Sequence, residues 1–360
     1  MKFKDIYNQK YVSDLAGAIQ QVYPGLDRRA LLAGVFDEEW ELRELKQRMR
    51  HITLVLGSLL PADYGTALSI LRQAAPSLSH FGFENMVFPD FVEVFGLDHW
   101  QASIPALEAF TQLISAEYAV RPFIVQDQER MMAQMLRWAH HESPDVRRLA
   151  SEGCRPRLPW GIRLQALEAN PAPILQILEA LKDDPSESVR RSVANNLNDI
   201  SKDNPEIVLD LARRWHADGG PEIEWIAKHA LRTLVKKGHP RALALLGYGP
   251  AAIDVRNLAV EPAAIAEGGE VTFSFDLESL ADEPQELMID FVIHLVRARG
   301  QRTPKVFKLA KRTLQPREVL HIEKVFSFRP VTTRKYYPGE HAFQPQVNGT
   351  TYGSISFQVG

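Results

Sequence analysis

The spacing of apolar residues changes once along this chain, at Gly247-Tyr248-Gly249-Pro250. Before that point they recur every three or four positions, clearest over residues 104–114, which is typical of helices that bury one face. After it they alternate with polar residues, clearest over residues 271–277, which is typical of half-buried strands. The change predicts an all-α domain over residues 1–250 and an all-β domain over residues 251–360.

Two helix starts in the first domain resemble each other. Val146-Arg147-Arg148 and Val189-Arg190-Arg191 each follow a break that contains proline, and they lie 43 residues apart. A weaker third copy places Ile223 after a spacing of 34 residues. A period near 43 is typical of HEAT-like repeats, whose helix pairs stack into a curved solenoid because no pair buries its apolar face alone. The concave surface of such a solenoid can wrap a long, regular partner.

The second domain contains about seven strand-like runs, the number expected of an immunoglobulin-like sandwich. Asn348-Gly349 is a typical hairpin turn between the last two runs. The same residues begin an Asn-Gly-Thr glycosylation sequon, but the chain starts without a secretory signal, so the turn interpretation is favoured.

Charges are segregated within this second domain. Residues 251–296 contain ten acidic residues and one basic residue, Arg256. Residues 297–335 contain twelve Lys and Arg and only two glutamates. A chain with a net charge of −3 is therefore expected to present one strongly basic surface.

Composition excludes several classes of protein. A hydrophobic content of 45% with 24% charged residues is typical of a folded chain rather than a disordered one. The single cysteine, Cys154, excludes an internal disulfide framework and a thiolate metal site, and the histidines lack metal-ligand spacing. We expect no metal and no cofactor. The chain also lacks an apolar signal segment or a membrane-length run, which predicts a cytoplasmic protein.

Four segments resemble the AlkC branch of the AlkC/AlkD family of DNA glycosylases. They are ISAEYAVRPF, SEGCRPRLPWGIRLQAL, SVRRSVANNLNDISKDNP and RKYYPGEHAFQPQVNG, and the resemblance covers nearly the whole chain. It implies a HEAT-like DNA glycosylase with an added immunoglobulin-like domain. It also implies removal of cationic alkylated bases, such as 3-methyladenine and 3-methylcytosine, from double-stranded DNA without a deep base-flipping pocket. Such a base leaves readily, so the enzyme needs carboxylates that stabilise the sugar cation and orient water.

Glu117 is the first candidate catalytic residue. We expect its helix to extend the apolar row of Phe110, Leu113 and Ile114, so that a carboxylate lies where the solenoid would bury it. The alternative is an ordinary ion pair with Arg121, one turn further on. The resemblance at AEYAVRPF favours catalysis.

Asp199 is the second candidate. Its helix buries Val189, Val193 and Leu197, whereas Arg191, Asn195 and Asp199 repeat every four residues on another face, joined by Asn196. Asn and Asp are poor helix formers for a merely solvated face. The alternative is a polar helix surface on which Asp199 pairs with Lys202, and the resemblance again favours a role in the site.

Trp160 is the third candidate, directly before an expected helix, where its ring can face a cationic base or a deoxyribose. The alternative is a buried indole that anchors the helix. In AlkD relatives aromatic rings flank the catalytic acid, and Tyr118 and Trp160 are the nearest equivalents here.

Basic residues are expected to contact DNA phosphates. In the helical domain these are Arg148, Arg155, Arg157 and Arg191, and in the sandwich they are Lys305, Lys308, Arg334 and Lys335, as a second clamp on the duplex. We expect a monomer. The competing hypothesis is a HEAT scaffold that binds protein or DNA without chemistry.

Overall fold

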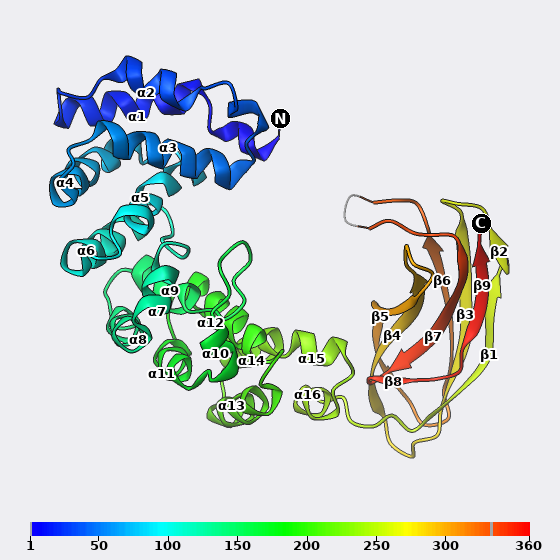
Figure 1. The fold of residues 1–360 in the computed structure, drawn as a ribbon. Coiled ribbons are helices and arrows are strands. Elements are labelled where there is room, and N and C mark those ends of the chain that lie inside the picture. The colour runs from blue at the N-terminus through cyan, green and yellow to red at the C-terminus, as the bar shows by residue number, and fades with distance from the viewer. Residues whose placement is uncertain (1, 332–333) are drawn as a thin grey trace. The chain divides into compact units, whose positions relative to one another are not determined.

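The computed structural model describes residues 2–331 and 334–360. Helices occupy the chain up to Leu245 and strands occupy it from Ile253, so the expected fold class, an all-α region followed by an all-β region, is confirmed (Figure 1). None of the helices within the described residues is long and apolar enough to cross a bilayer.

The α-helices are α1 (Gln9–Val22), α2 (Arg28–Val35), α3 (Leu45–Leu59), α4 (Tyr64–Ala74), α5 (Val87–Phe95), α6 (Trp100–Thr111), α7 (Val120–Gln126), α8 (Gln128–Trp138), α9 (Pro144–Gly153), α10 (Gln165–Ala169), α11 (Ala172–Leu181), α12 (Glu187–Ile200), α13 (Pro205–Asp218), α14 (Pro221–Ala230), α15 (Arg232–Lys236) and α16 (Pro240–Leu245). The strands are β1 (Ile253–Glu261), β2 (Ala264–Ile265), β3 (Glu270–Ser279), β4 (Gln285–Val296), β5 (Arg302–Leu314), β6 (Val319–Ser327), β7 (Gly339–Val347), β8 (Thr350–Thr351) and β9 (Ile355–Val359).

The chain forms two compact units. The first contains Met1–Asn204 and Asp218–Ala230, and the second contains Pro205–Ala217 and Leu231–Gly360. The second unit therefore holds α13, α15 and α16 in addition to the strands.

In the first unit, the segments that resemble each other lie on neighbouring helices. α9 begins at Pro144, whose fixed φ suits a first helical turn, and α12 begins after Ser186 in an extended conformation. α9 packs against α12, and α12 packs against α14. Val146, Val189 and Ile223, the equivalent positions of the three segments, are all buried. Equivalent residues are thus brought side by side, as a stacked repeat requires. The HEAT-like assignment itself stays a prediction.

In the second unit, two sheets pack face to face around an aromatic core. One has the strand order β1-β3-β6 and the other β2-β9-β7-β4-β5. Alternate residues of β3 are buried, because successive side chains of a strand point to opposite faces. Phe273 of β3 stacks on Phe343 of β7, with ring centroids 4.0 Å apart. Each fully buried ring of this kind contributes roughly 1.5–3 kcal/mol.

The predicted turn at Asn348-Gly349 is present. It joins β7 to the short strand β8, not directly to β9 as expected, with φ of 45° and 82°, the positive values that favour Asn-Gly in tight hairpins. A Cβ on Gly349 would lie 2.6 Å from the Cα of Gly238 and from the Leu243 side chain, so only glycine fits against the α15–α16 connection.

One acidic side chain lies on the outer face of the second sheet. Asp290 of β4 is 8% exposed, between the cross-strand partners Gln346 of β7 and Lys308 of β5. Burial raises the pKa of Asp290 to about 6, although nearby lysines including Lys308 and Lys236 act in the opposite direction.

Candidate active site

Asp199 lies near the end of α12, and its side chain is 2% exposed. Its Oδ2 accepts a hydrogen bond from Arg155 Nε at 2.8 Å, and its Oδ1 accepts one from Lys202 Nζ at 2.8 Å. The pair with Lys202, the alternative considered from sequence, does form. A buried carboxylate is tolerated only when cations and hydrogen bonds offset its desolvation, and Arg155 is the buried partner that does so here.

Arg155 also binds a second buried carboxylate, Glu152. Its Nη1 donates to Glu152 Oε1 at 2.6 Å, and Ser192 Oγ donates to Glu152 Oε2 at 2.6 Å. Burial opposes the charge on Arg155, but Glu152 and Asp199 outweigh it and hold the pKa of Arg155 above its usual value. The Arg155 side chain is 8% exposed. In this structure Arg155 thus joins two buried carboxylates, and the expected phosphate contact stays a prediction.

Glu117 does not lie on a helix, so the expected helical row is wrong. α6 ends at Thr111, and Glu117 lies in the turn before α7. Its Oε2 accepts hydrogen bonds from Ser115 Oγ at 2.8 Å and from both terminal nitrogens of Arg148 at 3.2 Å. All three hydrogen bonds are to Oε2, so Oε1 has no hydrogen-bond partner among the described residues. The Glu117 side chain is 15% exposed.

Arg148 connects Glu117 to the buried pair of Glu152 and Arg155. Its Nη2 lies 3.9 Å from Glu152 Oε1 on the same helix, and Glu152 in turn binds Arg155. We call Glu117, Arg148, Glu152, Arg155 and Asp199 the carboxylate network. The two carboxylates singled out from sequence are thus linked through two arginines and one further glutamate, within a single compact unit.

The alternative partner of Glu117, Arg121, has a different role. Its guanidinium is fully buried and donates to the carbonyl oxygens of Gly153, Arg155 and Ile162. Burial lowers the pKa of Arg121 to about 10. Arg121 therefore fixes the backbone of residues 153–162 rather than a carboxylate.

Trp160 lies in the loop held by Arg121, and α10 begins only at Gln165, so Trp160 does not directly precede a helix. Its side chain is 61% exposed, which excludes the buried-anchor alternative. Its φ is 64°, the left-handed region that non-glycine residues rarely adopt. Lys46 Nζ donates to the Trp160 carbonyl oxygen at 2.9 Å.

The same lysine contacts the ring of Tyr118, the residue after Glu117. Lys46 Nζ lies 4.4 Å from the centroid of the Tyr118 ring. Burial, followed by the charge of Glu117, raises the pKa of Tyr118 to about 12, so its hydroxyl stays protonated at neutral pH.

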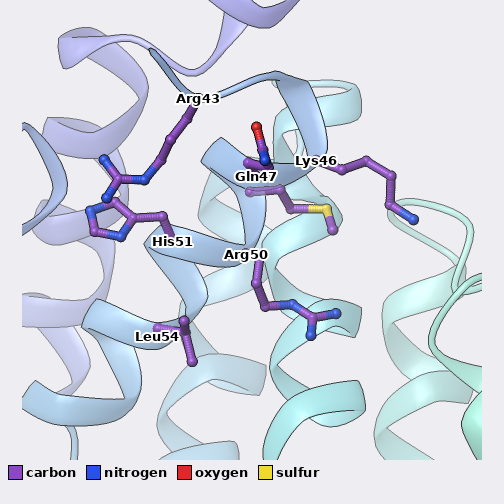
Figure 2. Close-up of a pocket in the computed structure, with 7 residues that line it drawn as sticks. Arg43, Lys46, Gln47, Arg50, His51 and Leu54 are labelled. Atoms are coloured by element: carbon purple, nitrogen blue, oxygen red, sulfur yellow. The ribbon is translucent and has the colours of Figure 1, made fainter. Parts of the chain in front are cut away.

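Lys46 belongs to a cavity of about 460 Å³ on α3, which Figure 2 shows. The cavity is lined by Arg43, Lys46, Gln47, Met49, Arg50, His51 and Leu54. Arg43 pairs with Asp37, and Arg50 pairs with Asp90 and Glu93, so much of the positive charge of the cavity is compensated. Lys46 instead contacts the Trp160 carbonyl oxygen and the Tyr118 ring.

The other arginines expected to contact DNA are more accessible than Arg155, and the Arg148 side chain is 30% exposed. Arg157 pairs with Asp203 at 2.6 Å and has a 29% exposed side chain. Arg191 pairs with Glu187 one turn earlier and has a 60% exposed side chain. The Arg191 pair is a single exposed contact of the kind that contributes little to stability, whereas Arg157 binds both oxygens of Asp203 and also lies 3.6 Å from Glu168.

In the second unit, two of the four cations expected to form a clamp lie close to Phe307 of β5. Lys305 Nζ lies 5.9 Å and the Arg334 guanidinium 5.1 Å from this ring. Burial and the charges of Arg334 and Lys236 lower the pKa of Lys305. Lys308 also lies on β5, and Lys335 lies over the ring of Tyr337 at 5.5 Å. Crowded cations favour an anionic partner that relieves their repulsion.

Comparison with known proteins covers the whole chain. Residues 254–360 match a family described as the C-terminal Ig-like domain of the uncharacterised protein YhaZ. YhaZ of Bacillus subtilis (strain 168) is 46% identical over 358 residues, which is 99% of each chain. The solved structure of Pseudomonas fluorescens alkylpurine DNA glycosylase AlkC, bound to DNA containing an abasic site analog, is 40% identical with a TM-score of 0.93 and 99% coverage of both chains. The chain belongs to the AlkC family. The resemblance seen in the sequence and the immunoglobulin-like character of the second domain are thereby confirmed.

In this AlkC-family chain, sequence reasoning missed Glu152, Ser192 and Lys46. Glu152 and Ser192 lie 40 positions apart, and Arg155 and Asp199 lie 44 apart, both near the period of 43 that relates the repeats. A search for polar residues separated by about this offset would have found Glu152 and Ser192. Lys46 reaches across 114 positions to Trp160, and no sequence pattern marks that contact. Within residues 2–331 and 334–360, the AlkC-family fold gathers no group of His, Cys, Asp and Glu suited to a metal ion.

Proposed function

We propose that this chain is a DNA glycosylase that hydrolyses the N-glycosidic bond of cationic alkylated bases, with 3-methyladenine and 3-methylcytosine as substrates. The observation that carries the proposal is the full-length similarity to AlkC, an alkylpurine DNA glycosylase bound to abasic-analog DNA, together with the carboxylate network. Double-stranded DNA is the proposed partner, and the protein acts as a monomer without a cofactor.

The chemistry suits a site that supplies negative charge. A base alkylated on a ring nitrogen carries a positive charge, so the C1′–N bond breaks with its electron pair on the base, which leaves neutral. The sugar becomes an oxocarbenium ion, water adds to C1′, and a carboxylate accepts the released proton. We assign stabilisation of the cation and orientation of water to Glu117, whose Oε1 is open, and to Asp199.

Asp199 and Glu117 differ in their surroundings. Asp199 is tied on both oxygens by Arg155 and Lys202, whereas Glu117 is tied on one oxygen by Arg148 and Ser115. We therefore assign the contact with water to Glu117. Asp199 contributes a fixed charge that requires no reorganisation as the sugar cation forms.

We further propose that residues 1–250 carry the glycosylase activity and residues 251–360 clamp the duplex. The exposed pairs of Arg157 and Arg191 and the crowded cations around Phe307 support phosphate contacts in both parts. Trp160, which is exposed and linked through Lys46 to Tyr118, the residue after Glu117, is assigned to the face of the base or the deoxyribose.

The test is base release from methylated duplex DNA by Glu117→Gln and Asp199→Asn. Each variant should lose about 100-fold or more in rate while it binds abasic-analog DNA with nearly unchanged affinity, because the lost carboxylate charge stabilises the cationic transition state. Glu129→Gln, at an exposed glutamate in the first turn of α8, is the matched control and should keep the wild-type rate.

Two outcomes would contradict the proposal. Wild-type rates in both variants would show that the roles of the two carboxylates are wrong. A wild-type protein that binds methylated DNA but releases no base would favour the non-catalytic scaffold.

A further inference from the structure

Lys46 occupies an unusual place between distant parts of the first unit. It lies in the first turn of α3, yet its ammonium donates to the carbonyl oxygen of Trp160 at 2.9 Å. The same ammonium lies 4.4 Å from the centroid of the Tyr118 ring. Tyr118 is adjacent to Glu117 in the chain, so one side chain of α3 touches two segments of the candidate active site.

The segment that Lys46 holds is conformationally demanding. Trp160 has a φ of 64° and an indole that is 61% exposed. A non-glycine residue in this region is strained and persists only when its surroundings over-determine its conformation. An exposed side chain contributes little packing, so the restraint must come from the backbone of the loop.

Two cations supply that restraint from different sides. Arg121 donates to the carbonyl oxygen of Ile162 at 2.7 Å, and a Cβ on Gly161 would lie 3.0 Å from Arg121 Nε. Lys46 donates to the carbonyl oxygen of Trp160 itself. The loop is therefore fixed from inside by a buried guanidinium and from the α3 side by a half-buried ammonium.

We propose that Lys46 is a positioning residue, which holds the Trp160 loop and the Tyr118 ring so that the exposed indole stands ready beside the carboxylate network before DNA binds. What the indole meets rests on the proposed function, namely the face of a base or a deoxyribose. Holding the loop in advance avoids the ordering cost that a mobile loop would incur on binding. This gives the otherwise unassigned N-terminal helices a part in the activity.

The first test measures the loop without any DNA. Trypsin cleaves after Arg157 and Arg163, on either side of Trp160. Lys46→Met keeps the length of the side chain but removes both contacts, so cleavage at these sites should become about tenfold faster, as expected for a loss of local stability near 1.4 kcal/mol. Lys46→Arg, which can still donate and stack, should restore slow cleavage.

A matched control is available on α1. Lys10 also lies over an aromatic ring, Phe81 at 4.9 Å, and pairs with Asp14. Lys10→Met makes the same chemical change away from the Trp160 loop, and it should leave cleavage at Arg157 and Arg163 at the wild-type rate.

The second test asks whether Lys46 acts through Trp160. Lys46→Met should slow base release about tenfold, and Lys46→Met in a Trp160→Ala background should be no slower than Trp160→Ala alone. Unchanged tryptic cleavage in Lys46→Met would overturn the proposal. The proposal would also be overturned if Lys46→Met left the loop unaffected but lowered the slope of log DNA affinity against log salt concentration by about 0.9, because that change marks the loss of one phosphate contact.

Failure of the proposed function gives a different result. If the wild-type protein releases no base but Lys46→Met still exposes the loop to trypsin, the positioning role stands and the glycosylase assignment falls.

Discussion

Arg155→Met is the change for which the structure makes the sharpest prediction. Arg155 donates to Asp199 at 2.8 Å and to Glu152 at 2.6 Å, and both carboxylate side chains are at most 7% exposed. Removing one partner of a buried ion pair costs about 3–5 kcal/mol, because a buried charge is left uncompensated. Asp199 keeps Lys202 and Glu152 keeps Ser192, so we expect the lower end, about 3 kcal/mol.

Urea unfolding at pH 7.5 measures this loss, with Arg191→Met as the matched control. Arg191 also pairs with a glutamate, Glu187, but both side chains are at least 60% exposed. An exposed pair contributes about 0–1 kcal/mol, so the control should be close to wild type. Adding Glu152→Gln to Arg155→Met should recover part of the loss, because one of the two stranded charges is removed.

The same variant distinguishes a buried tie from a DNA contact. If Arg155 only positions Asp199, base release should fall while the salt dependence of DNA affinity stays unchanged. Loss of a phosphate contact would lower that slope by about 0.9. A stability loss below about 1 kcal/mol, or a reduced salt slope, would refute the reasoning.

Three further predictions concern other parts of the chain. The pKa of Asp290, about 6 against an ordinary 3.8, means that the folded state binds this proton more tightly, so stability should fall as pH rises from about 4 to 6. The full loss of stability is at most about 3 kcal/mol. Thermal unfolding at pH 5 and pH 8 measures it, and Asp290→Asn should remove this pH dependence. If the pH dependence of the variant equals that of the wild type, Asp290 is not its source. Burial raises the pKa of Cys154 to about 12, so iodoacetamide at pH 8 should label it only in urea; rapid labelling of the native protein would contradict this. Replacing Lys305 and Lys308 by Met should lower the salt slope of DNA affinity by about 1.8 while the rate at saturating DNA is kept, and an unchanged slope would remove both from the clamp.

The fold class could be predicted because it depends on periodicity, which the sequence carries directly. The apolar rows over residues 104–114 and 271–277 distinguish helix from strand without any long-range information. The end of α6 could not be predicted in this way. No glycine or proline follows Thr111 directly, so the row appeared to continue to Glu117, whereas the chain turns before α7. The short strands β2 and β8 are too brief to show any alternation.

The candidate site was only partly visible in the sequence. Arg155 looked like a phosphate ligand because arginines are frequent in this part of the chain, yet it is buried. Burial of a charged residue depends on which carboxylates other helices bring to it, here Glu152 and Asp199, and a local window does not contain that information.

The position of β5 at the end of its sheet has a consequence for solubility. An edge strand leaves a row of backbone groups that can pair with another chain, and lysine and arginine side chains along such a strand discourage that pairing. The cations of β5 are therefore expected to discourage self-association along this edge. Neutralising them to weaken DNA binding would also remove this protection, and such variants should aggregate most readily in the absence of DNA.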